Sequence, residues 1–67
     1  MFRYILLLSD QQPNDPPCLV TPVPTPSVGS EVELADGSRA RVLDTNTTVH
    51  SHMRALGFSG VLTVEPV

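Results

Sequence analysis

Apolar and polar residues alternate on both sides of the dipeptide Asp36-Gly37, and this is the most regular pattern in the chain. Such alternation predicts two strands, and an Asp-Gly pair between them predicts a β-hairpin. A two-residue turn would place Leu34 opposite Arg39 and so mix core with charge on one face. A three-residue loop that ends at Gly37 removes this conflict and puts glycine at the left-handed position of such loops. We therefore predict a hairpin over residues 30–45.

This register pairs opposite charges on one face of the hairpin. Glu33 lies opposite Arg39 and Glu31 lies opposite Arg41, whereas Val32 belongs to the other, apolar face. The pairing commits two of the four arginines of the chain to glutamates. It also removes both glutamates as candidates for acid catalysis, because a neighbouring arginine depresses the pKa of a carboxyl group.

Residues 2–8 predict another strand. One face carries apolar side chains at a period of two: Phe2, Tyr4, Leu6 and Leu8. The other face includes Ile5 and Leu7 and is also mostly apolar. A strand that is apolar on both faces is typically internal to a sheet, or covered by a second layer or subunit.

Residues 9–29 contain six prolines, and this composition predicts a long loop. Proline donates no ladder hydrogen bond, which excludes both a helix and a central strand here. Residues 21–26 have proline at every second position and predict an extended, polyproline-like rod. A loop of this length in a small domain typically carries function or shields an exposed sheet edge.

A short helix over residues 48–56 and a strand over residues 61–65 complete the chain. Apolar residues recur at helical spacing in the helix: Val49, Met53 and Leu56. Gly57 stands directly after the helix, where a residue in the left-handed conformation typically ends it. Phe58 would then contact Met53 in a Schellman motif.

The run from Val28 to Val42 resembles the hairpin that many small SH3-like barrels carry, and the resemblance is confined to this run. It implies a single, mainly β domain over residues 1–67, an SH3-like barrel of about four to five short strands with one short helix before the last strand. The alternative is an α+β architecture, in which the helix packs on one face of an antiparallel sheet.

Size and composition favour association with a partner. A chain of 67 residues is at the small end of what folds unaided, and Cys18, the only cysteine, excludes an intrachain disulfide. We therefore expect binding to a protein partner or to itself, with a homo-oligomer favoured. The lone thiol suits a reducing compartment, and no apolar run has the length of a secretory core or a membrane span. We predict a cytoplasmic protein with no membrane contact.

Charge argues against nucleic acid as a partner. The net charge is −3 and lysine is absent, so no basic patch remains to neutralise a run of phosphates. A nucleic-acid-binding SH3-like domain stays an alternative that requires Arg39, Arg41 and Arg54 to be free on one face.

The histidines and the cysteine are the other candidates for chemistry. His50 and His52 would share a face of an extended segment and could there form part of a metal site with Asp44 or Cys18. On a helix they lie about 200° apart and cannot bind one ion together. Because the helical pattern is favoured, we predict no metal, cofactor or catalytic residue, and a protein that is not an enzyme. A small metal- or thiol-dependent enzyme that uses His50, His52 and Cys18 is the alternative.

The prediction for function is a non-catalytic binding or accessory module that acts through protein–protein contact, such as a regulatory subunit, an inhibitor or a phage-type accessory or structural protein. The expected contact surfaces are the proline-rich loop and an exposed edge of the strand over residues 2–8. The predicted partner-binding residues are Phe2, Tyr4, Pro16, Pro17, Leu19, Val20, Pro22, Val23, Pro24 and Pro26.

Overall fold

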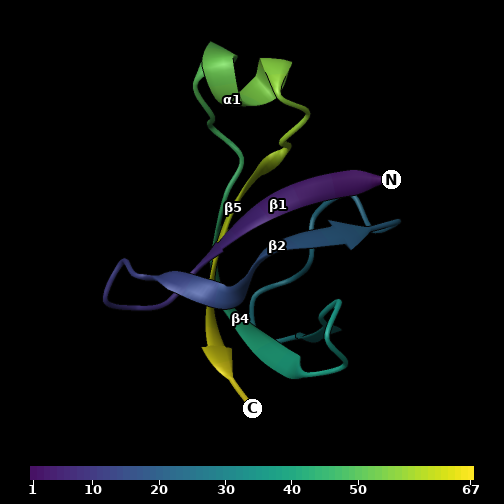
Figure 1. Ribbon diagram of the computed structural model, residues 1–67, viewed down its shortest axis with the longest axis vertical. Helices are drawn as coiled ribbons and strands as arrows, with labels where there is room; N and C mark the ends of the chain where they lie inside the picture. The colour runs from purple at the N-terminus through teal and green to yellow at the C-terminus, as the bar shows by residue number, and fades with distance from the viewer.

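Five strands and one short helix make up the computed structural model, which describes residues 1–67 (Figure 1). In chain order they are β1 (Phe2–Leu7), β2 (Pro13–Thr21), β3 (Glu31–Glu33), β4 (Arg39–Asn46), α1 (Ser51–Ala55) and β5 (Gly60–Pro66). The strands form one sheet in the order β2-β1-β5-β4-β3. Neighbouring strands are antiparallel except β1 and β5, which are parallel.

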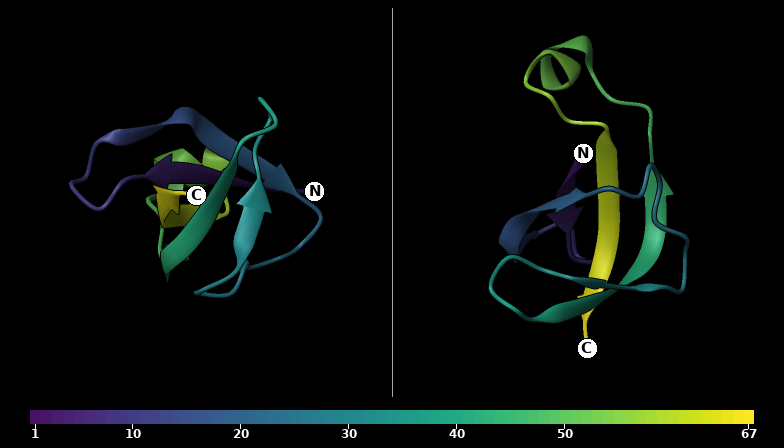
Figure 2. Two further views of the ribbon diagram at one scale, coloured as in Figure 1. Left: turned by 90° about the horizontal axis from the view of Figure 1, so that it is seen from below. Right: turned by 90° about the vertical axis from the view of Figure 1, so that its right-hand side faces the viewer.

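The sheet is strongly curled into a half-barrel (Figure 2). Its inner face carries the core, at alternating strand positions and at Leu34 directly after β3: Tyr4, Leu6, Leu19, Leu34, Ala40, Val42, Leu62 and Val64. The curl leaves β2 and β3 as two edge strands on either side of one opening. The prediction of a mainly β fold with one short helix before the last strand is confirmed.

The hairpin has the predicted register. Glu31 pairs with Arg41 and Glu33 pairs with Arg39. The N–H of Leu34 donates to the carbonyl oxygen of Ser38 at 2.8 Å and closes a three-residue loop. Gly37 has a φ of 87°, the left-handed conformation that the loop requires.

The loop predicted over residues 9–29 is wrong for its central part, because Pro13–Thr21 form β2 and pair with β1. Prolines are tolerated there because an edge strand needs its N–H groups on one side only. The polyproline rod over residues 21–26 is also wrong, since the chain bends at residues 22–25. The expected exposed edge of the first strand is absent as well: β1 lies between β2 and β5, and both of its edges are paired.

The helix is shorter than the predicted 48–56 and stands away from the sheet (Figure 1). None of its residues is buried, and Leu56 just after it is 55% exposed, so the expected apolar face does not pack on the core. Its predicted stop is confirmed. Gly57 has a φ of 94°, and the N–H of Phe58 donates to the carbonyl oxygen of Met53 at 3.1 Å, as in a Schellman motif.

Candidate binding groove between the two edge strands

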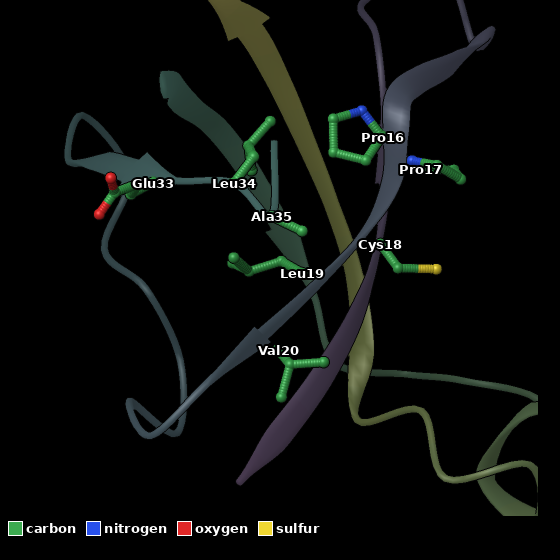
Figure 3. Close-up of a pocket in the computed structure, with 8 residues that line it drawn as sticks. All are labelled: Pro16, Pro17, Cys18, Leu19, Val20, Glu33, Leu34 and Ala35. Carbon is green, nitrogen blue, oxygen red and sulfur yellow. The ribbon is translucent and has the colours of Figure 1, made fainter. Parts of the chain in front are cut away.

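A groove of about 400 Å³ lies between β2 and the β3–β4 hairpin (Figure 3). Its lining comes from two short segments: Pro16, Pro17, Cys18, Leu19 and Val20 on β2, and Glu33, Leu34 and Ala35 on the hairpin. The volume is within the lower range of ligand-binding pockets in proteins. The groove is therefore the opening of the half-barrel, bounded by its two edge strands.

The free edge of β2 exposes the backbone groups of two residues. The carbonyl oxygen of Arg3 accepts a hydrogen bond from the N–H of Ser59 at 2.7 Å, so the backbone of Arg3 faces away from β2. Val20 lies directly opposite Arg3, and Cys18 lies two residues before it. Because backbone groups alternate between the two sides of a strand, the N–H and C=O of Val20 and Cys18 point to the free edge.

The free edge of β3 exposes the backbone groups of its two glutamates. Leu34 donates its N–H to Ser38, on the side of β4. The same alternation turns the backbone of Glu33 and Glu31 away from β4, toward the open edge. Two rows of unpaired donors and acceptors therefore face each other across the groove.

Leucine side chains form the floor of the groove. Leu19 and Leu34 are each 5% exposed and belong to the core of the half-barrel. Figure 3 shows Leu19 pointing from β2 toward the hairpin, whereas the side chains of Pro17 and Cys18 point away from it. Val20 is 53% exposed and forms part of the rim. An occupant would thus meet an apolar floor between two polar backbone edges.

The outer face of the hairpin carries an unbalanced charge. Glu31 accepts a hydrogen bond from Nε of Arg39 at 3.2 Å, and Arg41 bonds to Glu65 at 3.1 Å. Glu33 has no arginine within 4.0 Å, so the predicted ion pair between Glu33 and Arg39 is wrong. The reason is that Arg39 reaches diagonally to Glu31 instead of directly across. One uncompensated carboxylate therefore stands at the rim of the groove.

A second carboxylate lies in the hairpin loop next to the groove. Asp36 accepts hydrogen bonds from the hydroxyl and the backbone N–H of Ser38, at 2.5 and 2.9 Å. The hydroxyl bond, followed by the backbone bond, holds the pKa of Asp36 below its ordinary value. Ser38 therefore stabilises the charged form of this carboxylate beside the groove.

The predicted partner-binding residues fall into separate places. Pro16, Pro17, Leu19 and Val20 line the groove. Pro22, Val23 and Pro24 lie exposed on the connection that follows β2, and Pro26 is buried. Phe2 packs against the core, and Tyr4 is 1% exposed within it, so neither belongs to the groove.

Sequence reasoning missed the hairpin side of the groove. Glu33, Leu34 and Ala35 are not among the predicted partner-binding residues, because the alternation that predicts the hairpin does not show which of its edges stays unpaired. The missing ion pair of Glu33 has no signal in the sequence.

Residues considered for metal or thiol chemistry do not come together. His50 and His52 are exposed at the start of α1, and Cys18 is exposed on β2. No three His, Cys, Asp or Glu side chains gather in a way that could hold a metal ion. Arg54 lies on α1, apart from the hairpin that carries Arg39 and Arg41 (Figure 1).

The only helix, α1, has five residues and is too short to cross a membrane. Comparisons with protein-family models, with curated proteins and with solved structures find no match for this chain.

Proposed function

We propose that the chain is a non-catalytic binding module, and that it contacts a protein partner through the groove between β2 and β3. The observation that carries this function is the groove itself, in which unpaired backbone groups of two edge strands flank an apolar floor. Exposed strand edges of this kind bind extended segments of other proteins. The lining offers one thiol and one carboxylate and no histidine, which supports binding over acid–base catalysis.

The finer parts of the proposal rest on separate features. The three-residue hairpin and the helical turn before β5 support an SH3-like architecture. The single exposed thiol of Cys18 supports a reducing, cytoplasmic location. Exposed valines on β2 and on the connection to β3, among them Val20, Val23 and Val28, favour a second copy of the chain as the other candidate partner. Sedimentation over a concentration series tests self-association, and a monomer at all concentrations would contradict it.

Cross-linking from the groove tests the proposed function. Cys18 is the only cysteine and lines the groove from β2 with its side chain turned outward (Figure 3), so a photoreactive maleimide on a spacer long enough to reach around this edge samples a partner bound there. The matched control carries the same label on α1, at the other end of the molecule, in the double variant Cys18→Ser with Ser51→Cys. In an extract of the source cells, we expect one cross-linked protein from the groove label and not from the helix label.

A blocking variant makes this experiment specific. Val20→Arg places a long charged side chain at the rim, and the 53% exposure of Val20 allows it without loss of the fold. In a competition experiment, unlabelled wild type should suppress the cross-link, whereas unlabelled Val20→Arg should leave it in place, because the variant no longer binds the partner. Equal labelling from both positions, or equal competition by both proteins, would show that the groove is not the contact surface.

A further inference from the structure

The structure points to one mode of binding and one kind of partner segment. We propose that an extended segment of another protein, in which basic and apolar residues alternate, adds as a strand to the free edge of β3 and fills the groove. This mode rests on the proposed function, since it requires the groove to be the contact surface.

The backbone of β3 is the first part of the recognition. The N–H and C=O groups of Glu31 and Glu33 face the open edge, at the spacing of two residues that an added strand presents. In an antiparallel arrangement, the residues opposite these glutamates exchange both backbone hydrogen bonds with them. Strand addition therefore satisfies the unpaired groups along the whole of β3.

The glutamate side chains select the charge of the partner. Residues directly opposite in an antiparallel pair share a face, so the partner residues opposite Glu31 and Glu33 lie beside their carboxylates. Glu33 has no ion pair within the chain and remains available for a basic side chain. On the paired edge of β3, β4 presents the sequence Arg39-Ala40-Arg41, and Arg39 bonds diagonally to Glu31, which leaves Glu33 for the open edge. An added strand would repeat on the open edge the basic–apolar–basic pattern of β4.

The apolar floor selects the residue between the two basic ones. That residue lies opposite Val32, which is half-buried and packs against the core. It consequently points into the groove, toward Leu19 and Leu34. A valine or isoleucine at this position would bury its side chain and would also favour the extended backbone.

The same charges argue against a second copy on this edge. If two β3 strands paired antiparallel about Val32, Glu31 of one chain would face Glu33 of the other. Like charges directly opposite destabilise a strand pair. The edge thus favours a basic strand from a different protein.

A short capped peptide, Thr-Arg-Val-Arg-Val-Thr, is the probe that tests this mode. With a fluorophore on the peptide, we expect saturable binding to the full chain with a Kd below about 1 mM. The peptide Thr-Glu-Val-Glu-Val-Thr should bind at least about tenfold more weakly, and Glu33→Lys should weaken the arginine peptide by about tenfold. Asp10→Lys is the matched control: it makes the same two-unit change in charge at the exposed β1–β2 turn, away from the groove, and should leave the Kd unchanged.

N-methylation of the peptide backbone tests the hydrogen bonds. In the proposed register, the N–H groups of the arginines bond to β3 and those of the valines do not. Methylation of the backbone nitrogens of the two arginines should therefore abolish binding. Methylation of the backbone nitrogen of the first valine should change the Kd by less than about threefold. Circular dichroism and the thermal midpoint establish that Glu33→Lys and Asp10→Lys are folded.

The outcomes distinguish a failure of strand addition on β3 from a failure of the groove as the contact surface. No binding of the arginine peptide, or equal effects of the two methylations, overturns strand addition on β3. If the cross-link from Cys18 nevertheless forms, and unlabelled wild type suppresses it but unlabelled Val20→Arg does not, the groove remains the contact surface with another mode of binding. If the cross-link also fails, the proposed function is overturned. A homodimer whose formation Glu33→Lys strengthens would identify the second copy as the occupant instead.

Discussion

Substitution of Gly60 by alanine should destabilise the fold through a steric clash alone. Gly60 is buried at the start of β5, opposite Tyr4 of β1. A Cβ added there would lie 2.6 Å from the carbonyl oxygen of Asn46 and 3.3 Å from Cε1 of Tyr4. The nearer atom belongs to the backbone and cannot rotate away. Because Gly60 does not have a positive φ, the cost contains no contribution from left-handed strain.

The magnitude follows from two opposing contributions. Overpacking of a core costs about 1–3 kcal/mol, and the upper half applies here because backbone must move. Alanine also restricts the unfolded chain, which returns about 0.4–1 kcal/mol. We expect a net loss of about 2 kcal/mol in the free energy of unfolding, or about 8–16 °C in Tm for a domain of this size.

Thermal and urea unfolding followed by circular dichroism measure this loss. The control is Gly37→Asn, at a position where an added Cβ meets no atom within 4 Å and where the left-handed φ is one that asparagine tolerates. It should lose less than about 1 kcal/mol. A Tm of Gly60→Ala equal to or above that of wild type would refute the close approach of β5 to Asn46.

Three further substitutions test separate features. The hydroxyl of Tyr4 is buried without a hydrogen-bond partner, so Tyr4→Phe should raise the free energy of unfolding by about 1 kcal/mol; a lower urea midpoint would contradict this. Ser38→Ala should return the pKa of Asp36 toward its ordinary value, as measured by NMR titration. Since the pKa of Asp36 is lowered in the folded state, its carboxylate stabilises the fold above its ordinary pKa. This stabilisation is lost as the pH falls through the pKa of the folded state, so Ser38→Ala should lose less stability in acid than the wild type. Leu56→Lys should change stability by less than about 0.5 kcal/mol, because the side chain is 55% exposed, and a larger loss would show that α1 packs on a surface.

Local patterns predicted the elements whose partners are close in sequence. The hairpin could be worked out to the exact register because a shift by one residue would exchange its core and charged faces. The stop at Gly57 was equally accessible, since a Schellman motif involves only neighbouring turns of the chain. The cross-strand ion pairs were less predictable, because long side chains also reach diagonal partners, as Arg39 reaches Glu31.

Elements that depend on distant partners could not be predicted in the same way. Pro13–Thr21 form a strand because β1 offers a free edge, and no local feature of a proline-rich run shows that pairing. The spacing of Val49, Met53 and Leu56 predicts an apolar helical face, but the curled sheet leaves no surface near α1 for it to cover. Half of the groove was missed for the related reason that only the strand order shows which edges stay open.

The features that protect the two edges also determine what can bind them. Prolines on β2 and glutamates on β3 are devices by which proteins prevent edge-to-edge aggregation. Glu33 repels a second β3, yet the same carboxylate attracts a basic strand, so protection and partner choice arise from one side chain. A half-barrel with a small core has little stability to spare, and a segment that binds only the folded state adds about 2.7 kcal/mol at one hundred times its Kd. At that concentration a Kd about tenfold weaker leaves Glu33→Lys only about 1.4 kcal/mol of stabilisation, so the partner segment should raise the Tm of the wild type about twice as much as that of Glu33→Lys, which links the stability of this open sheet to its occupancy.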